Sequence, residues 1–149
     1  MKIRVYSKKD FINLMESNNL TSSNIEEVKS TIIISINDTS GVSYFKENLE
    51  NVLVLYFDDL TYLEAEDLTL FNKEHALKII KFFEKFKDKE NLIVHCSAGI
   101  SRSGALALYF NDYLRQDYFQ FKKDNPKIIP NGFIYSLLRE TYNEYKYKD

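Results

Sequence analysis

Three short segments of the chain have the pattern of buried β-strands. Thr31 to Ile36 (TIIISI), Val52 to Phe57 (VLVLYF) and Leu92 to His95 are almost wholly apolar, and Ile3 to Tyr6 is a further short strand-like segment. A strand with one solvated face alternates apolar and polar residues, whereas a strand that is buried on both faces is apolar throughout. These segments therefore predict a central sheet that is covered on both sides, and the VLVLYF strand is expected to carry over into Asp58.

Between the strand-like segments, apolar residues recur at helical spacing. The first helix is predicted to open with a capping box formed by Ser7 and Asp10 and to extend to about Met15. Four later helices are expected to begin near Asn72, Ser101, Gln116 and Gly132. Strands that alternate with amphipathic helices predict an α/β fold. We expect residues 1–149 to form a single domain with a mainly parallel central β-sheet and helices on both faces.

Composition narrows the classes of function. The 149 residues are 44% hydrophobic and 28% charged, and the net charge is -2 without a dense block of Lys and Arg, so a nucleic-acid partner is not expected. The one cysteine cannot form an intramolecular disulfide. The first residues lack the apolar core of a signal peptide, and no apolar run approaches the roughly 20 residues that span a bilayer. We therefore expect an intracellular, cytoplasmic protein with no membrane partner.

The segment that follows the last strand has the residues of an anion site. Cys96 ends the strand, five residues follow, and Arg102 stands where a helix begins. The N–H groups of such a loop and of a helix N-terminus favour a bound anion, and Gly99 allows a positive φ angle. In open α/β sheets, active sites lie at the carboxyl ends of the strands, which is where this loop falls.

The same field favours the thiolate form of Cys96 over the thiol. A thiolate is a good nucleophile and a good leaving group, and the planar fork of Arg102 suits two phosphate oxygens. A buried cysteine that only fills space is an alternative, but it does not account for Gly99, Arg102 and Ser103 together. A redox-sensing cysteine without hydrolase activity is a second alternative, although the chain has no second cysteine to resolve it.

The residues His95 to Gly104, HCSAGISRSG, resemble the active-site signature of the cysteine-based protein tyrosine phosphatase superfamily. The order of elements is similar to that superfamily from about Ile32 to Tyr142, and the small size resembles its dual-specificity branch. The resemblance implies that Cys96 is the nucleophile, that Arg102 binds phosphate, and that Ser103 assists departure of the thiolate. It also implies that backbone amides bind phosphate at Ser97, Ala98, Gly99, Ile100 and Ser101. It implies neither a metal nor an organic cofactor. The partner that it implies is a phosphorylated protein.

The superfamily places a general acid after the strand that precedes the long helix, where this chain has Asp58 and Asp59. A carboxylic acid there can protonate the leaving oxygen and then activate water. Asp59 is preferred, with Asp58 as the alternative and Asp67 as a more distant one. His95 is expected to point away from Cys96, because side chains alternate along a strand, and to order the loop. Asn131 is expected either to bind backbone near the loop or to cap the last helix.

The function predicted from these residues is hydrolysis of phosphotyrosine in proteins, with phosphoserine and phosphothreonine as further candidates, through a cysteinyl-phosphate intermediate. One alternative is a phosphatase of phosphoinositides or of RNA 5′ ends, since these enzymes share the signature. The uncharged residues of this loop disfavour a phosphoinositide phosphatase, because the members of the superfamily that act on lipids tend to carry basic residues in the loop. The other alternative is a pseudophosphatase that binds phosphoproteins without hydrolysing them.

Overall fold

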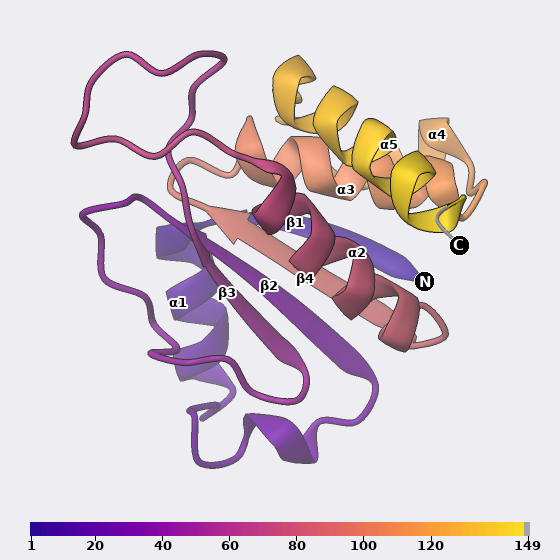
Figure 1. Ribbon diagram of the computed structural model, residues 1–149. Coiled ribbons are helices and arrows are strands. Elements are labelled where there is room, and N and C mark those ends of the chain that lie inside the picture. The colour runs from indigo at the N-terminus through magenta and orange to yellow at the C-terminus, as the bar shows by residue number, and fades with distance from the viewer. Residues whose placement is uncertain (148–149) are drawn as a thin grey trace.

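A four-stranded parallel sheet forms the centre of the protein. The computed structural model describes residues 1–147, and its strands lie in the order β1-β4-β2-β3 (Figure 1). All three pairings between neighbouring strands are parallel. The carboxyl ends of the strands therefore meet at one edge of the sheet. Their bounds are β1 Lys2–Ser7, β2 Thr31–Asn37, β3 Val52–Tyr56 and β4 Asn91–Cys96.

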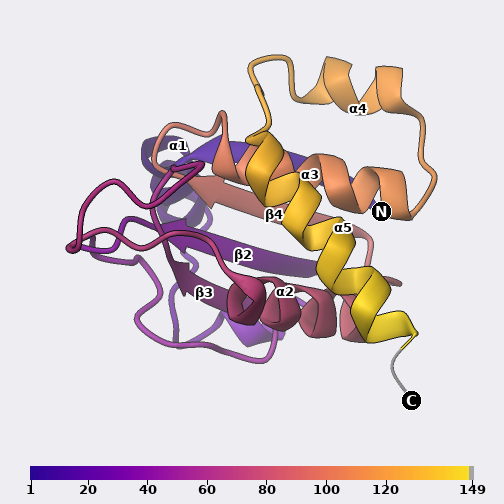
Figure 2. The ribbon, with the colours of Figure 1, turned by 45° about the horizontal axis from the view of Figure 1, so that its top comes forward.

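Helices cover both faces of this sheet. The helix α1 lies on the face opposite to α2 and α5, and Figure 2 shows α3 beside α5 on the α2 side. A short 3-10 turn, Ile25–Glu27, adds to the α1 side, where Ile25 is buried with the side chains of α1. The expected α/β fold with a parallel sheet and helices on both faces is thus confirmed. The helices span α1 Lys8–Ser17, α2 Lys73–Phe86, α3 Arg102–Tyr113, α4 Tyr118–Asp124 and α5 Gly132–Lys146.

The core has two layers, one on each face of the sheet. Along β2, Ile32, Ile34 and Ile36 belong to the larger cluster with α2, α3 and α5, while Ile33 belongs to the smaller cluster with α1. Successive side chains of a strand point to opposite faces, so a strand between two layers needs apolar residues at every position. This explains the continuous apolar run of β2. Within residues 1–147 no helix has the length and apolarity that a membrane crossing requires.

Two predicted boundaries were wrong. The helix expected from Gln116 begins at Tyr118, because the side chain of Asp117 caps it by accepting hydrogen bonds from backbone N–H groups. The strand VLVLYF does not carry over into Asp58: β3 ends at Tyr56. The chain leaves the sheet there because the N–H of Asp58 donates to the carbonyl of Thr69, 2.8 Å away, which closes the base of a long connection. In Figures 1 and 2 this connection, residues 57–72, extends beyond the ends of the strands.

Candidate active site

The loop between β4 and α3 lies at the carboxyl edge of the sheet, and its carbonyl groups are held from outside. The carbonyl of Ser97 accepts from the N–H of Lys8 at 3.1 Å, and that of Ile100 accepts from the N–H of Ile129 at 3.0 Å. The carbonyl of Ser101 accepts from the N–H groups of Ala105 and Asn131, each at 3.0 Å. In the described part of the chain, none of the N–H groups of residues 97–101 has a protein acceptor. The loop thus offers donors to an anion and directs its acceptors into the protein.

Gly99 gives this loop its shape. Its φ angle is +70°, in the left-handed region that favours glycine. A Cβ atom at this position would lie 2.5 Å from the backbone nitrogen of Ser7. The loop therefore packs directly against the junction of β1 and α1, where no larger residue fits.

Cys96 lies at the base of the loop as the last residue of β4, and only 2% of its surface is exposed. Its Sγ atom is 3.0 Å from the Oγ atom of Ser103, in the first turn of α3. The hydroxyl is thus placed to donate a hydrogen bond to a thiolate. The structure thus brings together Cys96 and the hydroxyl that the sequence paired with it.

Arg102 is 5% exposed, and its guanidinium group is held by three partners. Its Nη1 donates to the carbonyl of Phe57 at 2.8 Å and lies 2.8 Å from Oδ1 of Asp38. Its Nη2 donates to Oγ of Ser97 at 3.1 Å. Its Nε is buried and has no acceptor within residues 1–147. This leaves donors that suit an oxyanion.

The structure separates the two candidate acids by their surroundings. Asp58 is 9% exposed, and its carboxylate accepts from the N–H and hydroxyl of Thr39 and, at 2.8 Å, from the N–H of Thr69. Burial alone would raise the pKa of Asp58, but these hydrogen bonds, with the positive charge of Arg102, outweigh it and hold the pKa below its usual value. A carboxylate bound in this way closes the turn between two loops and stays ionised.

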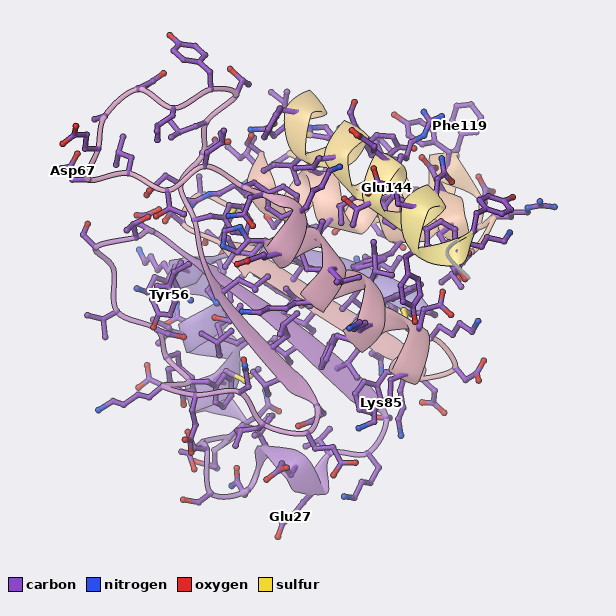
Figure 3. All side chains as sticks on the ribbon, viewed as in Figure 1. Glu27, Tyr56, Asp67, Lys85, Phe119 and Glu144 are labelled. Atoms are coloured by element: carbon purple, nitrogen blue, oxygen red, sulfur yellow. The ribbon has the colours of Figure 1, made fainter. Side chains whose placement is uncertain are left out.

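Asp59, in contrast, is exposed and faces the loop between β4 and α3. Its Oδ1 accepts from the hydroxyl of Ser101 at 2.8 Å and from the side-chain amide of Asn131 at 2.9 Å. Figure 3 shows Asp67 at the outer bend of the same connection, away from the sheet. Among the acids weighed from the sequence, Asp59 is the one whose carboxylate contacts the loop between Cys96 and Arg102.

His95 and Asn131 both lie beside the site. The ring of His95 is fully buried in the layer with α1, stacked on Phe11 at 4.2 Å between ring centroids, so it points away from Cys96 as predicted. Its Nε2 lies 2.6 Å from Oγ of Ser35, and burial lowers the pKa of His95 to about 4.

Asn131 fulfils both predicted roles, because its side chain caps α5 and its backbone N–H donates to the carbonyl of Ser101 in the loop.

Sequence reasoning missed Asp38. Its carboxylate pairs with Arg102 and also accepts from the hydroxyl of Ser97 at 3.1 and 3.2 Å. A signal was present, because Asp38 comes directly after β2 and the carboxyl ends of parallel strands meet at one edge. What the sequence lacked was the strand order that places β2 beside β4.

In this α/β domain, the loop between β4 and α3 joins a buried cysteine to a buried arginine, a combination suited to binding an oxyanion, and part of the chain is similar to known phosphatases. Residues 66–120 match the model of the protein-tyrosine phosphatase family. A MAP kinase phosphatase with leucine-rich repeats (protein 2) from Dictyostelium discoideum is 32% identical over 111 residues, which cover 64% of this chain and 16% of that relative. The chain therefore corresponds to a small part of that protein.

Solved structures have the same fold. Human DUSP28 matches with a TM-score of 0.55 and 13% identity, over 99% of this chain and 95% of that one. PTPMT1 in complex with PI(5)P matches with a TM-score of 0.53 and 15% identity, over 97% and 92%. At these identities the likeness shows the fold alone. Residues 66–120, which include the loop from Cys96 to Arg102, thus resemble the protein-tyrosine phosphatase family, and this match confirms the resemblance that the signature indicates.

Proposed function

We propose that residues 1–149 form one phosphatase domain that hydrolyses phosphotyrosine in proteins, with phosphoserine and phosphothreonine as further substrates, through a cysteinyl-phosphate intermediate. The observation that carries this proposal is the shared loop. Cys96, at its start, has Ser103 Oγ 3.0 Å from its sulfur, and Arg102, at its end, keeps a buried Nε without an acceptor in the described chain. The family match supports the same chemistry.

In the first step, Arg102 and the N–H groups of the loop would bind the phosphoryl oxygens. The sulfur of Cys96 attacks phosphorus, a sulfur–phosphorus bond forms, and the phosphorus–oxygen bond of the ester breaks. Protonated Asp59 gives its proton to the leaving oxygen, so the product leaves as a phenol or an alcohol. The contact between Asp59 and Ser101, 2.8 Å, supports this role because it holds the carboxyl group beside the loop.

In the second step, a water molecule attacks phosphorus and gives a proton to the carboxylate of Asp59. The sulfur–phosphorus bond breaks, and inorganic phosphate and the Cys96 thiolate are released. The hydroxyl of Ser103 donates a hydrogen bond to the departing sulfur and makes it a better leaving group. Arg102 stabilises charge on phosphorus in both steps.

Two other functions remain to be separated from this one by experiment. PTPMT1 binds PI(5)P in its structure, but the likeness at 15% identity concerns the fold. The side chains of residues 97–101 are uncharged here, which favours a protein substrate over a phosphoinositide or an RNA 5′ end. A pseudophosphatase is disfavoured because Cys96, Arg102 and Asp59 are all present at the loop.

The test is hydrolysis of para-nitrophenyl phosphate in EDTA by the wild type and by Cys96→Ser. We expect metal-independent turnover that the substitution abolishes. Competition between a phosphotyrosine peptide and inositol phosphates then identifies the substrate class. A folded wild type with a reduced thiol and no turnover would overturn the enzyme and favour the pseudophosphatase.

The assignment of the acid is tested with a matched pair of variants. Asp59→Asn is expected to lower kcat by about 100-fold, the usual size of a general-acid contribution. Asp58→Asn is expected to retain most of kcat, because its carboxylate is bound by Thr39 and Thr69. The opposite order of the two rates would reverse the assignment.

A further inference from the structure

Asp38 takes part in a closed set of contacts at the phosphate loop. Its Oδ1 lies 2.8 Å from Nη1 of Arg102, and the hydroxyl of Ser97 donates to its carboxylate at 3.1 and 3.2 Å. That hydroxyl in turn accepts from Nη2 of Arg102 at 3.1 Å. The carboxylate therefore binds both the arginine and the first residue of the loop.

The backbone that carries Asp38 is itself held in place. The N–H of Gly41 donates to the carbonyl of Asp38 at 2.8 Å, which closes a turn. The next residue, Thr39, donates both its N–H and its hydroxyl to Asp58. Although the side chain of Asp38 is 49% exposed, it is therefore anchored on a fixed turn at the end of β2.

The donors of Arg102 show what these contacts leave free. A guanidinium group has five N–H bonds in a planar fork. Nη1 donates to the carbonyl of Phe57 and forms an ion pair with Asp38, and Nη2 donates one N–H to Ser97. The second N–H of Nη2 and the N–H of Nε remain, and Nε has no acceptor within residues 1–147. Nε and Nη2 lie along one edge of the guanidinium plane, and bidentate binding of an oxyanion uses such an edge.

We propose that Asp38 is a positioning residue for phosphate: it holds the Nη1 end of Arg102 and the Ser97 hydroxyl, so that the Nε–Nη2 edge is presented to two phosphate oxygens. This inference rests on the proposed function, because it concerns how the same loop binds its substrate. Positioning of this kind raises affinity, since fewer orientations of the arginine are lost on binding.

The carboxylate has an opposing effect, because its negative charge repels a phosphate dianion. Asp38 is half exposed to water, which screens that charge, whereas Arg102 is 5% exposed and depends on its few partners for its orientation. Asp38 also contacts the Nη1 end of the guanidinium group, whereas phosphate would bind the Nε–Nη2 edge. Positioning therefore outweighs repulsion, and the sign of the change in phosphate affinity on removing Asp38 distinguishes the two effects.

The experiment measures binding of inorganic phosphate by calorimetry in the Cys96→Ser protein, which removes turnover. Asp38→Ala is expected to raise the Kd by about tenfold, the usual consequence of losing a hydrogen bond to a charged group. Asp38→Asn is expected to raise it by about threefold, because the amide oxygen can still accept from the hydroxyl of Ser97 although the ion pair with Arg102 is lost. The control is Glu47→Gln, which removes the same charge from an exposed residue of the β2–β3 connection and should leave the Kd unchanged.

The outcomes separate the inference from the proposed function. If the Cys96→Ser protein with Asp38 intact does not bind phosphate, the proposed function fails and the inference fails with it. If phosphate binds equally well with and without Asp38, or more tightly without it, the inference alone is overturned. A second measurement distinguishes weaker binding from a smaller amount of folded protein. The Kd is calculated for the folded fraction of each variant, and the urea midpoint of each variant is measured in parallel. A role in folding alone would shift the midpoint and leave the Kd unchanged.

Discussion

Acid is predicted to destabilise the protein through His95, which lies immediately before Cys96. Its imidazole is fully buried, 2.6 Å from the hydroxyl of Ser35 and stacked on Phe11. Burial disfavours the charged ring and lowers the pKa of His95 from 6.5 to about 4, and the nearby positive charges of Lys8 and Arg102 act in the same direction. The ring is therefore neutral in the folded protein at any pH well above 4.

The sign of the pH dependence follows from this shift. In the unfolded chain the pKa of His95 returns to 6.5, so at pH 5 the unfolded state binds a proton that the folded state does not. The stabilising contribution is complete above the unfolded pKa and is lost as the pH falls toward the folded one. With these two pKa values, the free energy of unfolding falls by about 2 kcal/mol between pH 7 and pH 5, and by about 3 kcal/mol by pH 4.

Urea denaturation at pH 7 and pH 5 measures this contribution when the wild type is compared with His95→Asn. Other titrating groups, Asp58 among them, are present in both proteins, so the difference in pH dependence isolates His95. We expect the wild type to lose about 2 kcal/mol more than the variant over this range. The NMR titration of the His95 ring in the wild type provides a second measurement, with little protonation expected above pH 5. Equal pH dependence in the two proteins, or a ring that titrates near 6.5, would refute the reasoning.

Three further predictions concern the loop and its support. Gly99→Ala should destabilise the fold by about 2 kcal/mol or more, because a left-handed φ is strained for alanine and its Cβ would lie 2.5 Å from the backbone nitrogen of Ser7. Urea denaturation measures this loss of stability, and an unchanged midpoint would contradict the prediction. Ser103→Ala should lower kcat by about tenfold, with a burst of nitrophenolate as the intermediate accumulates in stopped-flow assays. A single-phase reaction at the wild-type rate would show that the hydroxyl is dispensable. Asp58→Asn should lower stability by about 1 to 2 kcal/mol at pH 7, since it weakens the hydrogen bonds that close the β3–α2 connection, and thermal unfolding tests this.

Features that depend on neighbouring residues could be predicted from the sequence. The apolar run of β2 indicated a strand between two layers, and Ile33 indeed faces one layer while Ile34 faces the other. Cys96 and Arg102 are brought together by a loop of five residues, so their proximity follows from the chain itself. The positive φ of Gly99 and the pairing of Cys96 with Ser103 in the first turn of α3 are equally local.

Contacts between distant segments could not be predicted in this way. Asp58 and Asp59 are adjacent in the sequence, yet one is bound by Thr39 and Thr69 and the other by Ser101 and Asn131. The end of β3 decides this difference, because the direction in which the chain leaves the sheet sets where each side chain points. Composition and spacing contain no information about that direction.

The sequence alone predicts how the loop is built, because Cys96, Gly99 and Arg102 are within a few residues of one another and lie between a strand and a helix. Only the tertiary structure decided what surrounds that loop. The strand order places β2 beside β4, and this brings Asp38 to Arg102 and Ser35 to His95. The physical reason is that hydrogen bonds and ion pairs act over a few ångströms in space, whereas the residues that form them are about sixty positions apart along the chain.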